Sequence, residues 1–359
     1  MRRGAVLLPA AALLLLSGCA APSLTGLLPY AREIEDMELV RTLGVDAAAE
    51  GVTVTAAAGG ADGETGTASA GADTVSAAVL AMQVQGESYL YFGHVGQLLL
   101  GEDLARRGVE EALDYTLRDV EMRLETALYL VRDGTAAEAL EGAEGSAPDR
   151  LEALADGTGL SADTMTRSVK DVLADLADRG ASFVPALAAD GALTAAGYGI
   201  LKDGALAAWA EGEAAKGINL ILGRVDADVV DAAPPGQPPA ALRVVGARSL
   251  VRPVYENGAL AGLRVECTVE ANLAEGPSAV EEDRRQALET ALAEIERARI
   301  QAALDLASAQ DADYLGLRRA AALLAPWRKA ALLDGAGLGE LTLTARVEAN
   351  LQRSYHADG

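Results

Sequence analysis

The residue with the clearest capacity for chemistry is Cys19, which ends the segment Leu16-Ser17-Gly18-Cys19. Small side chains before the cysteine allow the backbone to enter a peptidase cleft. The thiol can carry a diacylglycerol thioether, and cleavage before it makes the modified cysteine the first residue of the mature chain. The segment therefore predicts a lipid attachment site at Cys19.

The residues before Cys19 have the composition of an export signal. Arg2 and Arg3 give a short positive start, and an apolar run from Ala5 to Leu16 follows. This run is too short for a transmembrane helix, which needs about 20 apolar residues. A positive start, a short apolar core and small residues at the cut are typical of a signal peptide. We expect cleavage of residues 1–18 and attachment to the outer face of a membrane; the alternative is an ordinary secreted protein.

The second cysteine, Cys267, lies in a stretch where apolar and polar residues alternate. Alternation of this kind predicts a strand with the cysteine on its apolar face. Lipidation of Cys19 would leave Cys267 without a disulfide partner. A nucleophilic thiol would need a nearby histidine, and the chain has only His94 and His356. We therefore interpret Cys267 as a buried structural thiol.

The remaining candidates have plain structural interpretations. We expect His94 to make a local hydrogen bond at a strand end, and Trp209 and Trp327 to pack in a core or between domains. The acidic run Glu281-Glu282-Asp283 fits a solvated helix N-terminus, where the macrodipole favours negative charge. The sequence has no phosphate-binding loop, zinc-ligand spacing or catalytic triad. We expect no enzymatic activity, no metal and no cofactor.

The charge of the chain limits its partners. The formal net charge is −23, and such an acidic protein repels nucleic acid and anionic headgroups. We therefore expect no nucleic-acid partner. Attachment to a membrane must come from covalent lipid or from a protein partner, and the two acyl chains of a diacylglyceryl cysteine are enough for stable anchoring.

Hydrophobic periodicity and turn residues predict a mixture of helices and strands. Asp203-Gly204 and Asn257-Gly258 each lie between apolar runs, as in tight β-hairpins. The segment Gly59 to Gly71 is expected to be a flexible hairpin loop. The other expected strands lie at 39–45, 51–57, 89–100, 124–131 and 340–351, and the expected helices at 74–82, 102–107, 109–117, 135–140, 161–179 and 281–310.

The longest expected helix, residues 281–310, should pack on a C-terminal antiparallel sheet. Its expected buried stripe is Leu288, Leu292, Ile295, Ala298, Ala302 and Leu306. The fold class is therefore α+β with more than one domain. We expect a signal peptide at 1–18, a lipidated tether at 19–31, an N-terminal domain at 32–190 that could divide again near 145, and a C-terminal domain at 191–355.

Short blocks of sequence in a fixed order carry a family resemblance. The first half contains Leu16-Ser17-Gly18-Cys19, Arg32-Glu33-Ile34-Glu35-Asp36, Leu43-Gly44-Val45-Asp46, Gly93-His94, Gly101-Glu102-Asp103-Leu104-Ala105-Arg106-Arg107-Gly108, Leu117-Arg118-Asp119 and Tyr129-Leu130-Val131. The second half contains Gly197-Tyr198-Gly199-Ile200-Leu201-Lys202-Asp203-Gly204, Glu213-Ala214-Ala215-Lys216-Gly217-Ile218-Asn219, Asn272-Leu273-Ala274-Glu275, Asp313-Tyr314-Leu315-Gly316-Leu317 and Trp327. Their order over nearly the whole mature chain resembles the Ger(x)C family, the lipoprotein C subunits of nutrient germinant receptors in endospore-forming bacteria.

The chain departs from the family pattern at a few positions. Ala20 stands where the family usually has Trp after the lipidated cysteine, and Leu201 and Ala215 replace Phe and Thr of two blocks. We expect these changes to affect surface specificity and to leave the fold intact.

The resemblance implies a protein without enzymatic activity that acts by contact with other proteins. Members of this family are anchored on the outer face of the spore inner membrane and work with two integral membrane subunits. It also implies a fold of three α+β domains. The alternative is an extracytoplasmic solute-binding lipoprotein of a transporter, whose repeated βαβ lobes would not share this order of blocks. A lipid-anchored hydrolase is disfavoured because no nucleophile has a suitable context.

Overall fold

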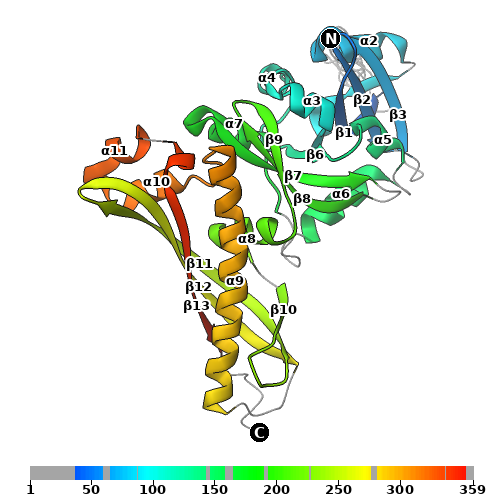
Figure 1. The fold of residues 1–359 in the computed structure, drawn as a ribbon. Coiled ribbons are helices and arrows are strands. Elements are labelled where there is room, and N and C mark those ends of the chain that lie inside the picture. Colours follow the sequence, from blue (N-terminus) through cyan, green and yellow to red (C-terminus); the bar gives the residue numbers. More distant parts are fainter. Residues whose placement is uncertain are drawn as a thin grey trace, which may run out of the picture.

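The computed structural model describes residues 37–59, 65–86, 88–142, 146–157, 165–189, 193–225, 228–275, 281–335 and 337–352. Cys19, the expected signal peptide and tether, and His356 lie outside these ranges. The strands form two sheets, and helices pack against both of them (Figure 1). This arrangement confirms the expected α+β class.

The described part of the N-terminal half is built on a nine-stranded sheet of order β3-β2-β1-β5-β6-β7-β8-β9, with β4 paired to β1. Its centre, β1-β5-β6-β7, is parallel, and antiparallel hairpins extend both edges. The strands are β1 Met37–Ala47, β2 Val52–Gly59, β3 Thr65–Ala72, β4 Tyr89–Tyr91, β5 Gln97–Gly101, β6 Ala127–Val131, β7 Ala181–Ala189, β8 Leu193–Lys202 and β9 Ala205–Ala210.

Helices cover both faces of this sheet. Along β5, Leu98 and Leu100 belong to a core shared with α2, α3, α4 and α7, whereas Leu99 belongs to a second core shared with α5 and α6. Central strands of a parallel sheet are apolar on both faces for this reason. The helices are α2 Val75–Gln85, α3 Glu102–Arg107, α4 Glu110–Arg118, α5 Ala136–Glu141, α6 Ala147–Gly157 and α7 Val169–Arg179, with the 3-10 turn η4 Phe92–His94 between β4 and β5.

The C-terminal half contains a four-stranded sheet in the described residues, of order β10-β11-β12-β13. The long helix α9 packs on this sheet as expected. The described elements of the C-terminal half are α8 Gly212–Leu222, β10 Asp228–Ala232, β11 Ala240–Glu256, β12 Ala259–Glu275, α9 Glu282–Gln310, α10 Leu317–Leu324, η6 Pro326–Arg328, α11 Lys329–Leu333, η7 Leu338–Glu340 and β13 Thr342–Leu351.

The expectation of an antiparallel C-terminal sheet holds for β10, β11 and β12, but β13 is parallel to β12. The chain leaves β12, crosses the sheet as α9 and returns through α10 and α11 before it enters β13. A helical crossover of this kind brings the next strand back in the same direction. The sheet is therefore mixed.

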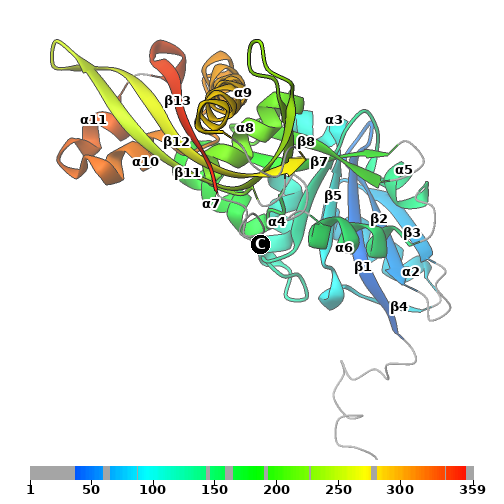
Figure 2. The same cartoon turned by 90° about the horizontal axis from the view of Figure 1, so that it is seen from below.

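The two halves share strands β7 and β8. Phe183 and Tyr198 belong to the core of the C-terminal half, whereas Val184 and Leu201 belong to the core beneath α4 and α7. Figure 2 shows the C-terminal sheet and α9 on one side of β7 and β8 and the N-terminal strands on the other. Strands β7 and β8, which lie on either side of the domain boundary expected near residue 190, pair with each other in the large sheet.

Several local expectations were wrong. Part of the expected loop from Gly59 to Gly71 is strand β3, which pairs with β2 over its length. Its Gly, Ala, Thr and Ser side chains give no apolar period, since one face of this edge strand is largely exposed. The helix expected from Ser161 begins at Val169 and is capped by Ser168; Ser161 itself lies outside the described residues. The spacing of Ala112, Leu113 and Leu117 predicts one shared helix face, but Leu117 is 52% exposed whereas the other two are buried.

Candidate functional site

The first blocks of the family resemblance meet where β1, β5 and α5 join. The N–H groups of Ala136 and Ala137 donate to Asp46 Oδ1 and Oδ2 at 2.7 and 2.9 Å. Asp46 thus accepts two N–H groups of the first turn of α5, which have no partner within the helix. Burial raises the pKa of Asp46 despite these two hydrogen bonds. A Cβ on Gly101 would lie 2.1 Å from Asp46 Oδ1. Asp46 and Gly101 therefore position elements of the fold.

The second-half blocks meet in the same way where β8 and α8 join. The Tyr198 hydroxyl donates to the Asn219 amide oxygen, and both side chains are fully buried. A Cβ on Gly217 would lie 2.0 Å from the Arg299 carbonyl oxygen, so glycine allows α8 and α9 to cross closely. The two departures from the family, Leu201 and Ala215, are also buried. They are core changes, and our expectation that they alter the surface was wrong.

A third junction follows the long helix. The carboxylate of Asp313 accepts the N–H groups of Leu317 and Arg318 at 2.7 and 3.0 Å and so caps α10. The buried Tyr314 hydroxyl donates to the Ala303 carbonyl oxygen at 2.8 Å. The family-like blocks at these three junctions thus hold elements together, and none of the side chains described there is set up for chemistry.

Sequence reasoning missed a buried ionic cluster centred on Arg299 in α9. The guanidinium group contacts Glu296 of the same helix at 3.0 Å, Asp228 of β10 at 2.6 Å and Glu213 of α8 at 3.0 Å. Lys216 Nζ lies 3.6 Å from Asp228. Arg299 and Glu296 are 6% and 0% exposed. The cluster therefore ties α8, α9 and β10 together inside the C-terminal half.

This cluster changes the buried face of α9. Beyond Leu292, the buried residues are Glu296, Arg299, Ile300, Ala303, Leu304 and Ala307. The expected stripe is therefore only partly right beyond its first two members: Ile295 and Leu306 are half-buried against the core, but Ala298 is exposed. The prediction counted apolar residues alone and so could not include a buried Glu and Arg. Their i,i+3 spacing was the available signal.

Burial, together with the excess negative charge of the cluster, changes the pKa of Glu296. Burial, which disfavours the charged carboxylate, raises the pKa of Glu296 to about 7, although Arg299 opposes the shift. Asp228 and Glu213 add to the negative charge around it. Glu296 is therefore only partly ionised at neutral pH.

The other sequence candidates have no shared site. His94 is exposed at η4 with its ring edge-on to Tyr91. Trp209 packs against the N-terminal core, whereas Trp327 is 78% exposed and the expectation that it packs in a core or between domains was wrong. The run Glu281-Glu282-Asp283 forms the exposed start of α9, as expected.

Cys267 has the position expected from its alternating neighbours. It lies in β12, is 3% exposed, and burial raises the pKa of its thiol. A buried thiol of raised pKa is a poor nucleophile at neutral pH. Cys267 is therefore a structural residue of the C-terminal core.

Replacement of Cys267 by alanine tests this role. We expect the free energy of unfolding to fall by about 1 kcal/mol, because a small buried group leaves a small cavity. Urea unfolding measures this cost, and the variant should keep the biological function of the wild-type protein. Loss of that function in a variant that still folds would show that the thiol has a role of its own.

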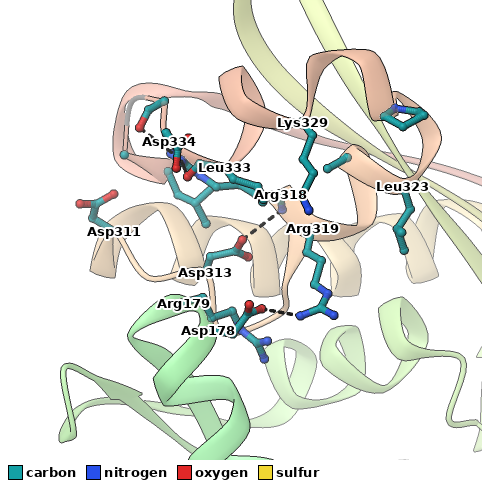
Figure 3. Close-up of a pocket in the computed structure, with 15 residues that line it drawn as sticks. Asp178, Arg179, Asp311, Asp313, Arg318, Arg319, Leu323, Lys329, Leu333 and Asp334 are labelled. Carbon is teal, nitrogen blue, oxygen red and sulfur yellow. Dashed lines mark hydrogen bonds and ion pairs between the residues drawn. The ribbon is translucent and has the colours of Figure 1, made fainter.

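A cleft of about 720 Å³ lies between α7, the turn after α9 and the segment from α10 to α11. Charged side chains from all three elements line it (Figure 3). Three of its four carboxylates are engaged: Asp178 pairs with Arg319 at 2.8 Å, Asp313 caps α10, and Asp311 accepts the Gly339 N–H at 3.0 Å. No Ser, Thr, Cys or His is among the lining residues. The cleft is a polar joint between the two halves.

Two further observations concern ligands and membranes. Within the described ranges, no group of three or more His, Cys, Asp or Glu residues is arranged to hold a metal ion. Among the helices described there, none is both long and apolar enough to cross a membrane.

Comparison with known proteins gave two family matches and one structural match. The spore germination protein N-terminal domain matches residues 30–189, and the spore germination B3/GerAC-like C-terminal domain matches residues 196–354. A solved structure titled "Crystal Structure of the GerBC protein" is similar with a TM-score of 0.58 and 16% identity, over 86% of this chain and 96% of that chain. Identity at this level shows a shared fold. A search of curated proteins gave no match.

Proposed function

The chain belongs to the Ger(x)C family of spore germination proteins, and from this premise we propose that it is the lipid-anchored subunit of a nutrient germinant receptor that acts by protein–protein contact. The observation that carries the proposal is the placement of the family blocks. Asp46, Asn219 and Asp313 each join two elements of the fold. Family-like residues that stabilise the fold support a protein that acts through its surface, by contact with partners.

Membrane attachment in this proposal comes from Cys19. The lipobox predicts a diacylglyceryl group on its thiol, and the signal peptide predicts export. The mature chain would then lie on the outer face of the spore inner membrane. Tethering raises its effective concentration beside membrane-embedded partners, so even weak contacts persist. We propose two integral membrane receptor subunits as these partners and assign no enzymatic activity to the chain.

Deletion of the gene tests this function against the solute-binding alternative. We expect deletion spores to lose the germination response served by their own receptor, while solute uptake by growing cells stays normal. Complementation with the wild-type gene is the control. If deletion spores respond normally to every nutrient and uptake of one solute collapses, the chain is the binding lipoprotein of a transporter.

A further inference from the structure

The segment from Leu317 to Leu333 differs in charge from the rest of the chain. It contains four basic residues and no acidic residue, in a chain of formal net charge −23. Its helices α10 and α11, joined by η6, lie beside the tip of the β11–β12 hairpin, at the end of the molecule remote from β3 (Figures 1 and 2). We call residues 317–333 the α10–α11 lobe.

The lobe has both packed and exposed apolar residues. Leu317, Ala321 and Leu332 are buried in the C-terminal core. The exposed set is Leu323 at 77%, Leu324 at 41%, Trp327 at 78% and Leu333 at 38%, of which Leu323 and Leu333 line the cleft described above. Scattered single apolar residues need no explanation, but several within one short segment indicate a contact surface. Trp has an apolar ring with a polar N–H and favours boundaries between apolar and wet surroundings.

The basic residues of the lobe divide into two pairs. Arg318 donates to the carbonyl oxygens of Leu333 and Gly335, and Arg319 pairs with Asp178, so both hold the lobe in place. Arg328 and Lys329 follow Trp327 directly, and both are exposed. The Arg328 guanidinium lies 4.2 Å from the Tyr255 ring centroid.

The two basic residues beside Trp327 differ in their surroundings: Lys329 lines the cleft that also contains Asp178, Asp311, Asp313 and Asp334, whereas Arg328 lies over Tyr255. Within the described part of the chain, no ion pair to a carboxylate involves Arg328 or Lys329. Two cations thus adjoin the exposed Trp and Leu side chains. Anionic headgroups above an apolar layer are the complement of this surface.

We propose that the α10–α11 lobe rests on the anionic lipid surface of the membrane, with Trp327 and its neighbouring leucines at the acyl boundary and Arg328 and Lys329 among the headgroups. Basic residues beside Trp and Leu are typical of helices that lie in a membrane interface. The strongly acidic remainder of the chain is repelled by the same surface, so the lobe sets the orientation of the protein. This inference rests on the proposed lipid anchor.

The length of the tether sets how far the lipid anchor can reach from β1. The 17 residues between Cys19 and Met37 can span at most about 60 Å. The lipid at Cys19 would hold the chain at the membrane, and the lobe would decide which face points toward it. A fixed orientation would present the same surface to the membrane subunits at each encounter.

The two tryptophans of the chain allow a direct test. The chain from Cys19 onward, which keeps every described element, is coupled through the Cys19 thiol to a maleimide lipid in phosphatidylglycerol–phosphatidylethanolamine vesicles. Cys267 is buried and does not compete. With Trp209→Phe, Trp327 is the only tryptophan, and we expect lipids brominated near the headgroup to lower its fluorescence about twofold. With Trp327→Phe, Trp209 reports the packed side of the protein and should be unaffected.

Charge-reversal variants distinguish membrane binding by the lobe from a nonspecific effect of surface charge. Arg328→Glu with Lys329→Glu should abolish the quenching of Trp327, whereas Arg118→Glu, on exposed α4, should preserve it. Vesicles of phosphatidylcholine alone should give weaker quenching. If Trp327 stays unquenched in anionic vesicles, or becomes shielded only when the membrane subunits are added, the lobe is a protein-docking surface and the proposal is wrong. Chemical coupling makes the result independent of lipidation in the cell and of the germination phenotype.

Discussion

Replacement of Arg299 by methionine is expected to lower the free energy of unfolding by about 3–5 kcal/mol at pH 8. Methionine fills much of the space but leaves the Glu296 and Asp228 carboxylates, 0% and 11% exposed in their side chains, without their guanidinium partner. A buried charge that loses its partner keeps its full desolvation cost. Equilibrium unfolding in guanidinium chloride, followed by circular dichroism, measures the loss.

The effect should depend on pH in a definite direction. The folded-state pKa of Glu296 is raised to about 7, above its ordinary value of 4.5. Its neutral form therefore favours the folded state below pH 4.5, and this contribution is lost as the pH rises through 7. Because Glu296 is largely neutral at pH 5, the Arg299→Met variant should lose less stability there than at pH 8.

Arg297→Met is the matched control on the same helix. Arg297 pairs with Glu294 at 2.9 Å, but its side chain is 44% exposed, so the change should cost at most about 1 kcal/mol. Equal losses in the two variants would mean that the buried cluster does not hold α8, α9 and β10 together. A pH-independent loss would show that Glu296 does not change its ionisation state between pH 5 and pH 8.

Replacement of Cys19 by alanine is expected to abolish palmitate labelling and to remove the protein from the washed membrane fraction. The acidic chain has no other strong means of attachment, since its net charge is −23 and the α10–α11 lobe offers only a few contacts. Spores with this variant should lose most of the germination response of their receptor, because tethering sets the local concentration of the subunit.

Cys267→Ala is the matched control for this experiment, since it removes the other cysteine. Labelling and membrane association should be unchanged in it. Labelling that persists in the Cys19→Ala chain would place the lipid elsewhere, and a variant that stays in the membrane fraction unlabelled would be held there by the α10–α11 lobe or by protein contacts.

Local signals predicted much of the fold correctly. Asp203-Gly204 and Asn257-Gly258 form the two expected hairpin turns, with positive φ at all four residues. Thr135 caps α5: its hydroxyl accepts the Glu138 N–H, and its own N–H donates to the Glu138 carboxylate. These features depend on a few neighbouring residues, so they can be recognised from the sequence alone.

Features that depend on distant contacts were not predictable in the same way. Strand β3 has no apolar period, and its strand character comes from pairing with β2. Arg299, which is buried with Glu296, forms ion pairs with Asp228 and Glu213, which lie on other elements. The exposure of Trp327 depends on how the α10–α11 lobe packs, which no local pattern encodes.

Purification of the protein from detergent-solubilised spore inner membrane tests the central claim most directly. Wild-type protein carrying an affinity tag should bring down the two integral membrane subunits of its receptor, and the subunits should be absent from a mock purification of untagged spores. Mass spectrometry of the eluate identifies the partners. Recovery of the protein with neither receptor subunit, or with the membrane components of a solute transporter in their place, would contradict the assignment as a germinant-receptor subunit.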